Sequence, residues 1–336
     1  MINHIRKLFE LEKQPHKRLF ALEWVVLAYV VFTLLVIFFT YTKVQNPDSL
    51  ILGRVKIVII TFALWAVYRM MPCRFTRMTR VLGQMALLSW WYPDTYELNR
   101  VFPNLDHLFA SAEQWLFGCQ PSLLFYEKMP WPLFSELMDL GYASYYPLMA
   151  IVLYWYFFRR YGEFERASVI VLASFFLYYV VYIFLPVTGP MFYFHAIGLD
   201  QAAQGVFPNV GHYFSSHTDY LPTPGWTDGI CYWMVEVAHA AGERPTAAFP
   251  SSHVGVSTVL MLLVWHARSK KLFWALMPIY LLLCFSTVYI QAHYAIDAIA
   301  GLITGWLIWL LLMWLTRSLV EEEKPAKARK PKKMKS

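Results

Sequence analysis

Hydrophobic residues along this chain gather into long runs that short polar segments separate. The eight runs that are candidates for membrane spans are residues 21–41, 55–71, 79–96, 133–158, 166–186, 251–267, 272–291 and 293–316. Because about 20 helical residues cross the hydrocarbon core of a bilayer, each run predicts one crossing. The run at 79–96 is the least apolar, since Pro93 and Asp94 interrupt it, but the alternation of basic loops requires it. The pattern predicts an all-α, polytopic membrane bundle of about eight helices, six of them forming its core.

Positively charged residues divide unequally between the two sides that eight crossings define. Segments on the side of the N-terminus hold 23 of the 29 Lys and Arg residues, and segments on the opposite side hold 6. Cytoplasmic loops of membrane proteins carry an excess of Lys and Arg. We therefore expect cytoplasmic termini, with the outer loops in the periplasm of a bacterium or in a lumen of a eukaryote. The run at 21–41 lacks a small-residue cleavage site, which favours a retained span over a signal peptide.

The composition agrees with an integral membrane protein. Hydrophobic residues make up 58% of the 336 residues and charged residues 15%, which excludes an ordinary soluble domain. The segment 317–336 is rich in Lys and predicts a disordered tail held near anionic lipid. Nucleic-acid binding is disfavoured, because no folded module accompanies these basic residues.

Two segments on the outer side differ from simple connections. Residues 187–250 form the one long outer loop, with turn signals at 222–225, and a loop of this length is often a functional lid. Residues 104–132 carry apolar positions at helical spacing and predict a helix lying along the outer interface. The four histidines of the long loop match no metal-site spacing, and we expect them to be solvated; they are His195, His212, His217 and His239.

Two histidines and an aspartate are expected to meet at the outer surface. His253 and His293 are 40 residues apart with two crossings between them, so both return to one face. Asp297 follows His293 by four residues and shares its helix face. A carboxylate there can fix the imidazole tautomer and produce a nucleophile or a general base. Singly each residue would be interfacial or capping, but three polar groups at one depth favour a reaction centre.

The residues before His253 predict an anion site. Ser251 follows Pro250 and is expected to be the N-cap of a helix whose first residue is Ser252. Free N–H groups and the helix dipole at such a terminus favour an anion such as phosphate. A histidine beside a bound phosphate can protonate a leaving oxygen.

These motifs resemble those of a known family. Residues 249–253, Phe-Pro-Ser-Ser-His, and 293–297, His-Tyr-Ala-Ile-Asp, followed by Ala-Ile-Ala-Gly, resemble the second and third motifs of the type 2 phosphatidic acid phosphatase superfamily. Residues 185–190, Leu-Pro-Val-Thr-Gly-Pro, take the place of the first motif. Together with 141–147, Gly-Tyr-Ala-Ser-Tyr-Tyr-Pro, they resemble the inositol phosphorylceramide synthase branch.

The resemblance implies a metal-independent lipid phosphotransferase without a cofactor. His293 would attack phosphorus and form a phosphohistidine, Asp297 would orient it, and His253 would be the acid for the leaving group. The substrate would be a phospholipid or lipid phosphate, with a ceramide-like or polyol acceptor. The residues expected to contact substrate are Ser251, Ser252, Arg244, Gly189, Pro190, Tyr289, Asp139 and Tyr146. The chain would be one membrane domain over 1–336, with N-terminal spans and an interfacial segment over 21–158 and a phosphatase-like catalytic core over 166–316.

The chain departs from the family pattern in its cations. Met191 follows Gly189-Pro190 where a basic residue is usual, and Ser286-Thr287 stands where Ser-Arg is usual. Arg244 is the one basic residue of the long outer loop, and it is either a substitute phosphate clamp or an exposed loop residue. A phosphate dianion in a poorly hydrated site needs such compensation.

Three other functions remain open on the sequence alone. A lipid phosphate phosphatase needs only water as the acceptor. A non-catalytic protein that binds or translocates lipid would tolerate the missing cations. A channel or secondary transporter is disfavoured, because the chain has no repeated half and no pair of discontinuous helices. Asp139, with Glu136, lies near Tyr142, Tyr145 and Tyr146, where carboxylates would either bind a polyol headgroup or mark an interfacial segment.

Overall fold

A computed structural model describes residues 6, 8–13 and 15–319. These residues form a helical bundle with no β-strand among them, which confirms the predicted all-α membrane fold. The basic tail predicted beyond residue 319 lies outside the described residues.

The connections between helices are short except in the segment between α12 and α14. In chain order they are α2 (Ala21–Phe39), α3 (Pro47–Met70), α4 (Arg74–Ala86), α5 (Leu88–Asn99), α6 (Asp106–Phe117), α7 (Pro121–Lys128), α8 (Pro132–Ala143), α9 (Tyr145–Arg159), α10 (Tyr161–Phe184), α11 (Pro190–Ile197), α12 (Leu199–Ala203), η1 (Tyr213–Ser215), α13 (Ile230–Gly242), α14 (Ser252–His266), α15 (Lys270–Tyr289), α16 (Ala295–Leu315) and η2 (Arg317–Leu319). Among the described residues, five helices are long and apolar enough to cross a membrane, namely α2, α3, α10, α15 and α16.

The remaining three predicted spans are shorter or broken. The run at 251–267 corresponds to α14, which has 15 residues. The runs at 79–96 and 133–158 correspond to the pairs α4–α5 and α8–α9, which break near Leu87 and Ser144. Pro147 explains the second break, because it has no N–H to donate to the Ala143 carbonyl and its ring clashes there. A count of eight crossings therefore stays a prediction.

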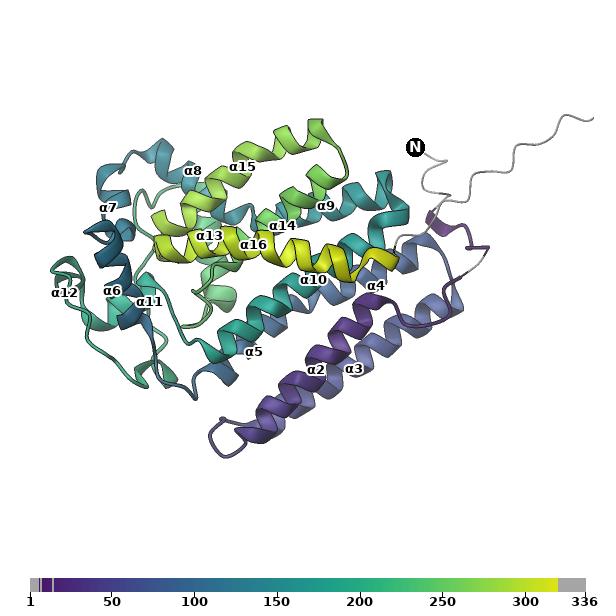
Figure 1. The fold of residues 1–336 in the computed structure, drawn as a ribbon, viewed down its shortest axis with the longest axis horizontal. Helices are drawn as coiled ribbons and strands as arrows, with labels where there is room; N and C mark the ends of the chain where they lie inside the picture. The colour runs from purple at the N-terminus through teal and green to yellow at the C-terminus, as the bar shows by residue number, and fades with distance from the viewer. Residues whose placement is uncertain (1–5, 7, 14, 320–336) are drawn as a thin grey trace, which may run out of the picture.

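Figure 1 shows how the elements divide between the two ends of the bundle. The start of α2 and the end of α16 lie at one end, and α6, α7, α11 and α12 lie at the other. The segment predicted at the outer interface forms α6 and α7, and the long outer loop folds into α11, α12, η1 and α13. The loop is thus a helical cap over one end of the bundle.

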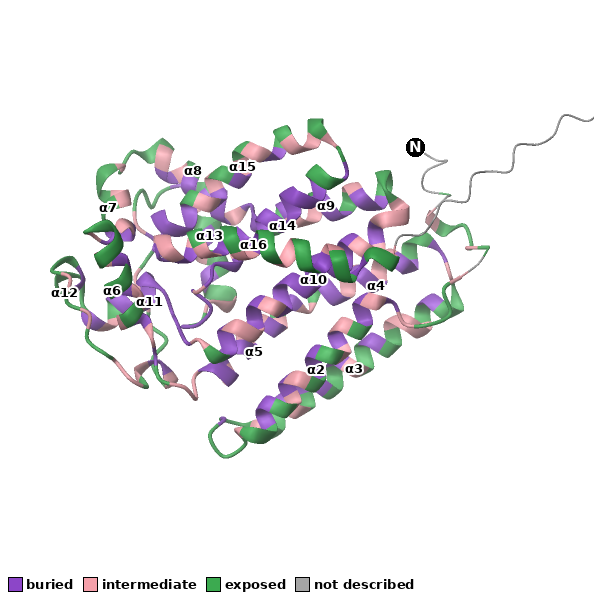
Figure 2. Ribbon diagram, viewed as in Figure 1, coloured by how far each residue is buried: buried purple, intermediate pink, exposed green. Residues whose placement is uncertain are grey.

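Helices α10 and α14 form the buried centre, and α16 packs closely against α14 (Figure 2). Glycines permit this close approach. A Cβ atom at Gly301 would lie 2.5 Å from the Ser251 carbonyl oxygen, and one at Gly305 would lie 2.6 Å from that of Gly255. Small residues let membrane helices approach backbone to backbone. The contact brings the first turn of α14 beside the first turn of α16.

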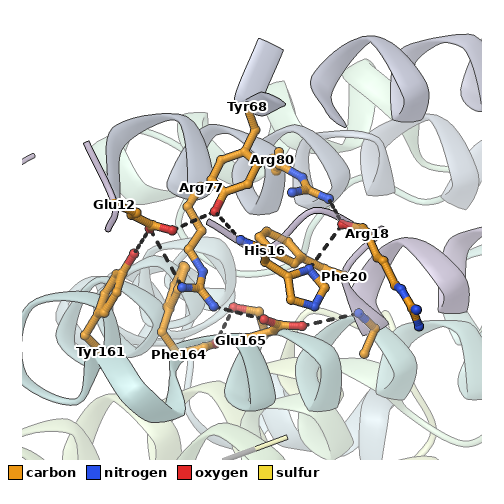
Figure 3. A network of polar contacts seen from close by, with 12 residues as sticks. Glu12, His16, Arg18, Phe20, Tyr68, Arg77, Arg80, Tyr161, Phe164 and Glu165 are labelled. Carbon is orange, nitrogen blue, oxygen red and sulfur yellow. Dashed lines mark hydrogen bonds and ion pairs between the residues drawn. The ribbon is translucent and has the colours of Figure 1, made fainter. Parts of the chain in front are cut away.

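Buried ion pairs fasten the N-terminal helices to one another and to α10. Arg80 of α4 pairs with Glu23 of α2, and both side chains are fully buried. Arg77 of α4 donates to Glu165 of α10 at 3.1 Å, in the polar network of Figure 3. Charged groups in a poorly hydrated bundle need such partners.

Candidate active site

His253 and His293 meet at the capped end of the bundle. His253 lies in the first turn of α14, and His293 lies in the short connection between α15 and α16. The Nε2 atom of His293 lies 3.4 Å from the Nδ1 atom of His253, and the ring centroids are 5.6 Å apart. The fold therefore places two imidazoles within reach of one small group.

His293 is held by backbone groups. Its Nδ1 atom lies 2.8 Å from the carbonyl oxygen of Ala248, and its backbone N–H donates to the Thr287 carbonyl at 2.9 Å. A carbonyl accepts only, so Nδ1 carries the proton and Nε2 keeps its lone pair. Burial lowers the pKa of His293 to about 4, which keeps the ring neutral near pH 7. A neutral imidazole with a lone pair on Nε2, here directed towards Nδ1 of His253, is a nucleophile.

Asp297 lies beside this ring without a direct hydrogen bond to it. Its Oδ2 atom is 3.7 Å from Nδ1 of His293 and accepts the backbone N–H of Tyr294 at 2.9 Å. Its Oδ1 atom is buried and has no hydrogen-bond partner among the described residues. Asp297 thus caps α16 and places a carboxyl group near His293, while the Ala248 carbonyl makes the hydrogen bond that fixes the tautomer.

His253 is packed between tyrosines. Its ring stacks on Tyr142 with centroids 4.7 Å apart and lies 4.4 Å from that of Tyr145. These two tyrosines flank the break between α8 and α9. The break therefore turns two rings towards His253 and fixes its position.

The start of α14 has fewer free donors than the sequence predicts. Ser251 is the N-cap as expected, and its side chain accepts the Val254 N–H at 3.4 Å. The Ser252 N–H donates to the Tyr182 hydroxyl at 2.9 Å, and that hydroxyl donates to the Pro250 carbonyl. Two N–H groups of this terminus are thus already bonded within the protein.

Asp106 of α6 is a buried anchor that sequence reasoning missed. Its carboxylate accepts the backbone N–H groups of Thr188 at 2.7 Å and Gly189 at 2.9 Å. It also accepts the hydroxyl of Tyr294 at 3.0 Å and the amide of Asn104 at 2.6 Å. Asp106 therefore ties the segment in the place of the first motif to the residue after His293.

Glu113, two turns further along α6, reaches the start of α16. Its Oε2 atom accepts the Ile296 N–H at 3.3 Å, and its Oε1 atom is buried without a partner among the described residues. Burial raises the pKa of Glu113 to about 8. Asp106 and Glu113 share a buried helix face with Ala110, whereas apolar residues of the segment such as Leu108 and Trp115 are exposed, so the apolar pattern does not mark either acid.

A cavity of about 270 Å³ opens beside His253. Aromatic side chains dominate its lining, which includes Tyr92, Tyr142, Tyr145, Tyr146, Phe175 and Tyr179. Its polar lining residues include Ser252, His239 and Glu243. No Lys or Arg stands among the described residues that line it.

His239 corrects one expectation from the sequence. It was expected to be a solvated loop histidine, but α13 buries it to 2% exposure against the rings of Tyr142 and Tyr220. Both ring nitrogens lack a hydrogen-bond partner among the described residues. Burial lowers the pKa of His239 to about 4. The ring is a neutral polar group without a hydrogen bond in the wall of the cavity, and its Nδ1 atom lies 3.9 Å from the Glu236 carboxylate.

The other predicted substrate contacts lie at different distances from the histidines. Tyr146 lines the cavity. Arg244 is exposed and lines a neighbouring hollow with Asp94 and Glu97, and its guanidinium donates to the Glu243 carbonyl. Asp139 is fully buried, and neither carboxyl oxygen has a partner among the described residues.

Three predicted residues, Gly189, Pro190 and Tyr289, are buried against other segments of the fold. Gly189 has a φ of 89° and lies against the Ala292 carbonyl, where a Cβ atom would be 2.5 Å away. Pro190 starts α11 and is buried. Tyr289 donates its hydroxyl to the Met129 carbonyl at 3.0 Å and faces α7 and α8. Gly189 and Pro190 are therefore adjacent to the His293 segment, whereas the Tyr289 hydroxyl is occupied elsewhere.

Comparison with known proteins identifies one family. A family model described as the PAP2 superfamily matches residues 106–311. The match begins at Asp106 and spans α6 to α16, so the N-terminal helices α2 to α5 lie outside it. No curated protein and no solved structure matches the chain.

Proposed function

The chain belongs to the PAP2 superfamily, and from this premise we propose that it is a metal-independent membrane phosphotransferase that acts on a lipid phosphoester through a phosphohistidine at His293. Membership of this family supports lipid phosphoester chemistry in general, of the phosphatase or the phosphotransferase type. The finer assignment to the inositol phosphorylceramide synthase branch rests on residues 141–147 and 185–190. A ceramide-like or polyol alcohol would be the acceptor.

The pairing of His293 with His253 carries the proposal. His293 Nε2 attacks phosphorus, the N–P bond forms, and the ester P–O bond breaks. His253, 3.4 Å from that nitrogen, gives its proton to the departing oxygen. An alcohol oxygen then attacks phosphorus, the N–P bond to His293 breaks, and the alcohol gives its proton to His253, which restores both rings.

Asp297 supports the first step by its position. A ring bonded to phosphorus at Nε2 and to the Ala248 carbonyl through Nδ1–H carries a positive charge. A carboxylate 3.7 Å from Nδ1 stabilises that charge. We assign Asp297 this electrostatic role.

Two alternative functions are retained beside the proposed transferase activity. Water as the acceptor would make the protein a lipid phosphate phosphatase. The lack of Lys or Arg among the described residues lining the cavity favours a non-catalytic lipid-binding protein as the second alternative. Arg244 would have to move from the neighbouring hollow to clamp phosphate.

Incubating the purified full-length protein with ³²P-labelled phospholipids tests the proposal. The assay is run with and without ceramide or a polyol, and the products are separated. A labelled product that requires the alcohol is expected. Free phosphate from a lipid phosphate, or a phosphomonoester from a phosphodiester lipid, formed without any alcohol would identify the phosphatase. Intact binding with no turnover of any lipid would identify the non-catalytic protein.

A further inference from the structure

The cavity beside His253 combines an aromatic wall with a single carboxyl group. Six aromatic side chains from α5, α8, α9 and α10 line it, and pairs of them stand close together. The rings of Tyr145 and Tyr146 are 5.2 Å apart, those of Tyr145 and Phe175 5.9 Å, and those of Tyr92 and Tyr179 6.4 Å. Aromatic faces grouped in this way attract cations, and above all quaternary ammonium groups.

Glu243 supplies the negative charge at this wall. Its carboxylate accepts the Tyr92 hydroxyl at 2.7 Å, and it lies within electrostatic range of Tyr142, Tyr146, His293 and Arg244. Arg244 bonds to the backbone carbonyl of Glu243, and no ion pair joins the Glu243 carboxylate to a cation among the described residues. Removal from water raises the pKa of Glu243. A cation bound beside the carboxyl group would oppose this rise and favour the charged form.

The remaining polar groups suit a weakly charged phosphate. Lys and Arg, which offset a phosphate dianion, are missing from the described lining. Neutral donors are present instead, because His239 is buried with both ring nitrogens unpartnered and His253 stands beside it in the wall. A phosphodiester has one negative charge, and a cationic headgroup cancels it. A zwitterionic ligand therefore brings no net charge into this cavity, whereas a dianion brings two negative charges.

We propose that the cavity binds the headgroup of a zwitterionic phosphodiester lipid, with a quaternary ammonium group between the aromatic wall and Glu243 and the phosphate towards His239 and His253. The proposal rests on the proposed function, since it names the substrate class of the same site. The volume of about 270 Å³ is near the lower limit of ligand pockets and suits a headgroup, while the acyl chains stay in the membrane. Tyr146, 54% exposed, stands at the rim.

Binding of soluble headgroup phosphodiesters tests the charge preference without turnover. Full-length His293→Ala protein in non-ionic detergent is titrated with glycerophosphocholine, with its uncharged tert-butyl isostere and with glycerophosphoinositol, and saturation-transfer NMR gives each Kd. We expect glycerophosphocholine to bind about tenfold or more tightly than the isostere, as for a desolvated cation–π site. Equal affinity for the isostere, or a preference for glycerophosphoinositol, would overturn the proposal.

Variants locate the preference in the cavity. Glu243→Gln in the His293→Ala background should remove most of the tenfold preference, whereas Glu97→Gln, in the neighbouring hollow, should keep it. Tyr146→Leu should weaken glycerophosphocholine binding several-fold, and Tyr146→Phe should preserve it, because the ring face is what matters. A preference that survives Glu243→Gln and Tyr146→Leu together would place the ammonium elsewhere and contradict the proposal.

Turnover separates this proposal from the proposed function. Wild-type protein is given ³²P-labelled phosphatidylcholine, phosphatidylinositol and phosphatidic acid, and all phosphate that leaves the donor lipid is counted. Turnover without preference for phosphatidylcholine would overturn the headgroup assignment and leave the enzyme in place. Selective glycerophosphocholine binding without turnover of any lipid would refute the enzyme and keep the headgroup assignment.

Discussion

His293 is oriented by a backbone carbonyl, which no side-chain substitution can remove. The Ala248 oxygen fixes the proton on Nδ1, so the lone pair of Nε2 faces His253. In triads in which a carboxylate alone holds the imidazole, replacing it costs about four orders of magnitude in rate. Here Asp297 is left with the stabilisation of charge. Because the Ala248 carbonyl orients the ring, we expect His293 to stay correctly oriented when Asp297 is altered.

The separate roles of the two histidines predict different responses to the leaving group. His253→Ala should lose activity on a lipid phosphoester by about 10²–10⁴-fold, the usual contribution of a general acid. The same variant should recover much of it on an activated aryl phosphate, whose leaving group needs no proton. His293→Ala should be inactive on both. Steady-state rates on the two substrates measure this, and equal losses for His253→Ala on both would contradict its role as acid.

Burial of neutral histidines predicts a pH-dependent stability. The pKa of His239 and that of His293 are both lowered to about 4, against about 6.5 in the unfolded chain. Between these values the unfolded state binds more protons, so stability rises with pH from about 4 to 6.5 and is lost as pH falls. Thermal unfolding in detergent should show this slope, and His239→Phe should reduce it. A slope unchanged in His239→Phe would mean that His239 is protonated in the folded protein.

At the scale of helices, a buried ion pair holds the N-terminal helices α2 and α4 against each other. Arg80→Met should destabilise the protein by about 3–5 kcal/mol, because it leaves Glu23 buried and unpaired. Replacing both, as Arg80→Met with Glu23→Leu, should restore most of the loss. Glu163→Gln removes a partly exposed pair with Arg160 and serves as a control with an effect within about 1 kcal/mol.

Chemical or thermal unfolding of these variants in one detergent supplies the comparison. A double variant as unstable as Arg80→Met alone would show that packing of the guanidinium, and not its charge, is what α2 and α4 require. The guanidinium carbon of Arg80 lies 3.6 Å from the ring centroid of Phe20. We therefore expect packing against this ring to contribute to the stability that Arg80 provides.

Helix positions followed from the sequence because hydrophobic runs dictate them in a membrane. The five long helices coincide with five of the predicted runs, and Ser251 caps α14 as expected. The break at Ser144 lies inside one predicted span, 133–158, although Pro147 marks it in retrospect. It matters for the site, because it turns Tyr142 and Tyr145 onto His253.

At the scale of the whole molecule, the part of the site that the sequence could not reveal depends on long-range docking. Asp106 binds Gly189 and Tyr294, which are 83 and 188 residues away. His239 is buried only because α13 packs against α8. Local periodicity places such residues on a helix face, but it does not state which element covers that face.

The topology predicts opposite labelling of two engineered cysteines. Ser215 lies in η1 at the capped end, and Ser269 lies between α14 and α15 at the other. With the four native cysteines replaced, Ser215→Cys should react with an impermeant thiol reagent from the outer side, and Ser269→Cys only after the membrane is opened. Labelling of both from one side would contradict the predicted sidedness, which rests on the division of Lys and Arg.

Trapping the covalent intermediate tests the central claim most directly. Wild-type protein is mixed with a ³²P-labelled phospholipid, quenched with denaturant at alkaline pH and separated by electrophoresis. We predict a label on the protein that alkali leaves intact and mild acid removes, as expected of a phosphoramidate, and no label on His293→Ala. A label that persists on His293→Ala, or wild-type turnover that never labels the protein, would contradict His293 as the nucleophile.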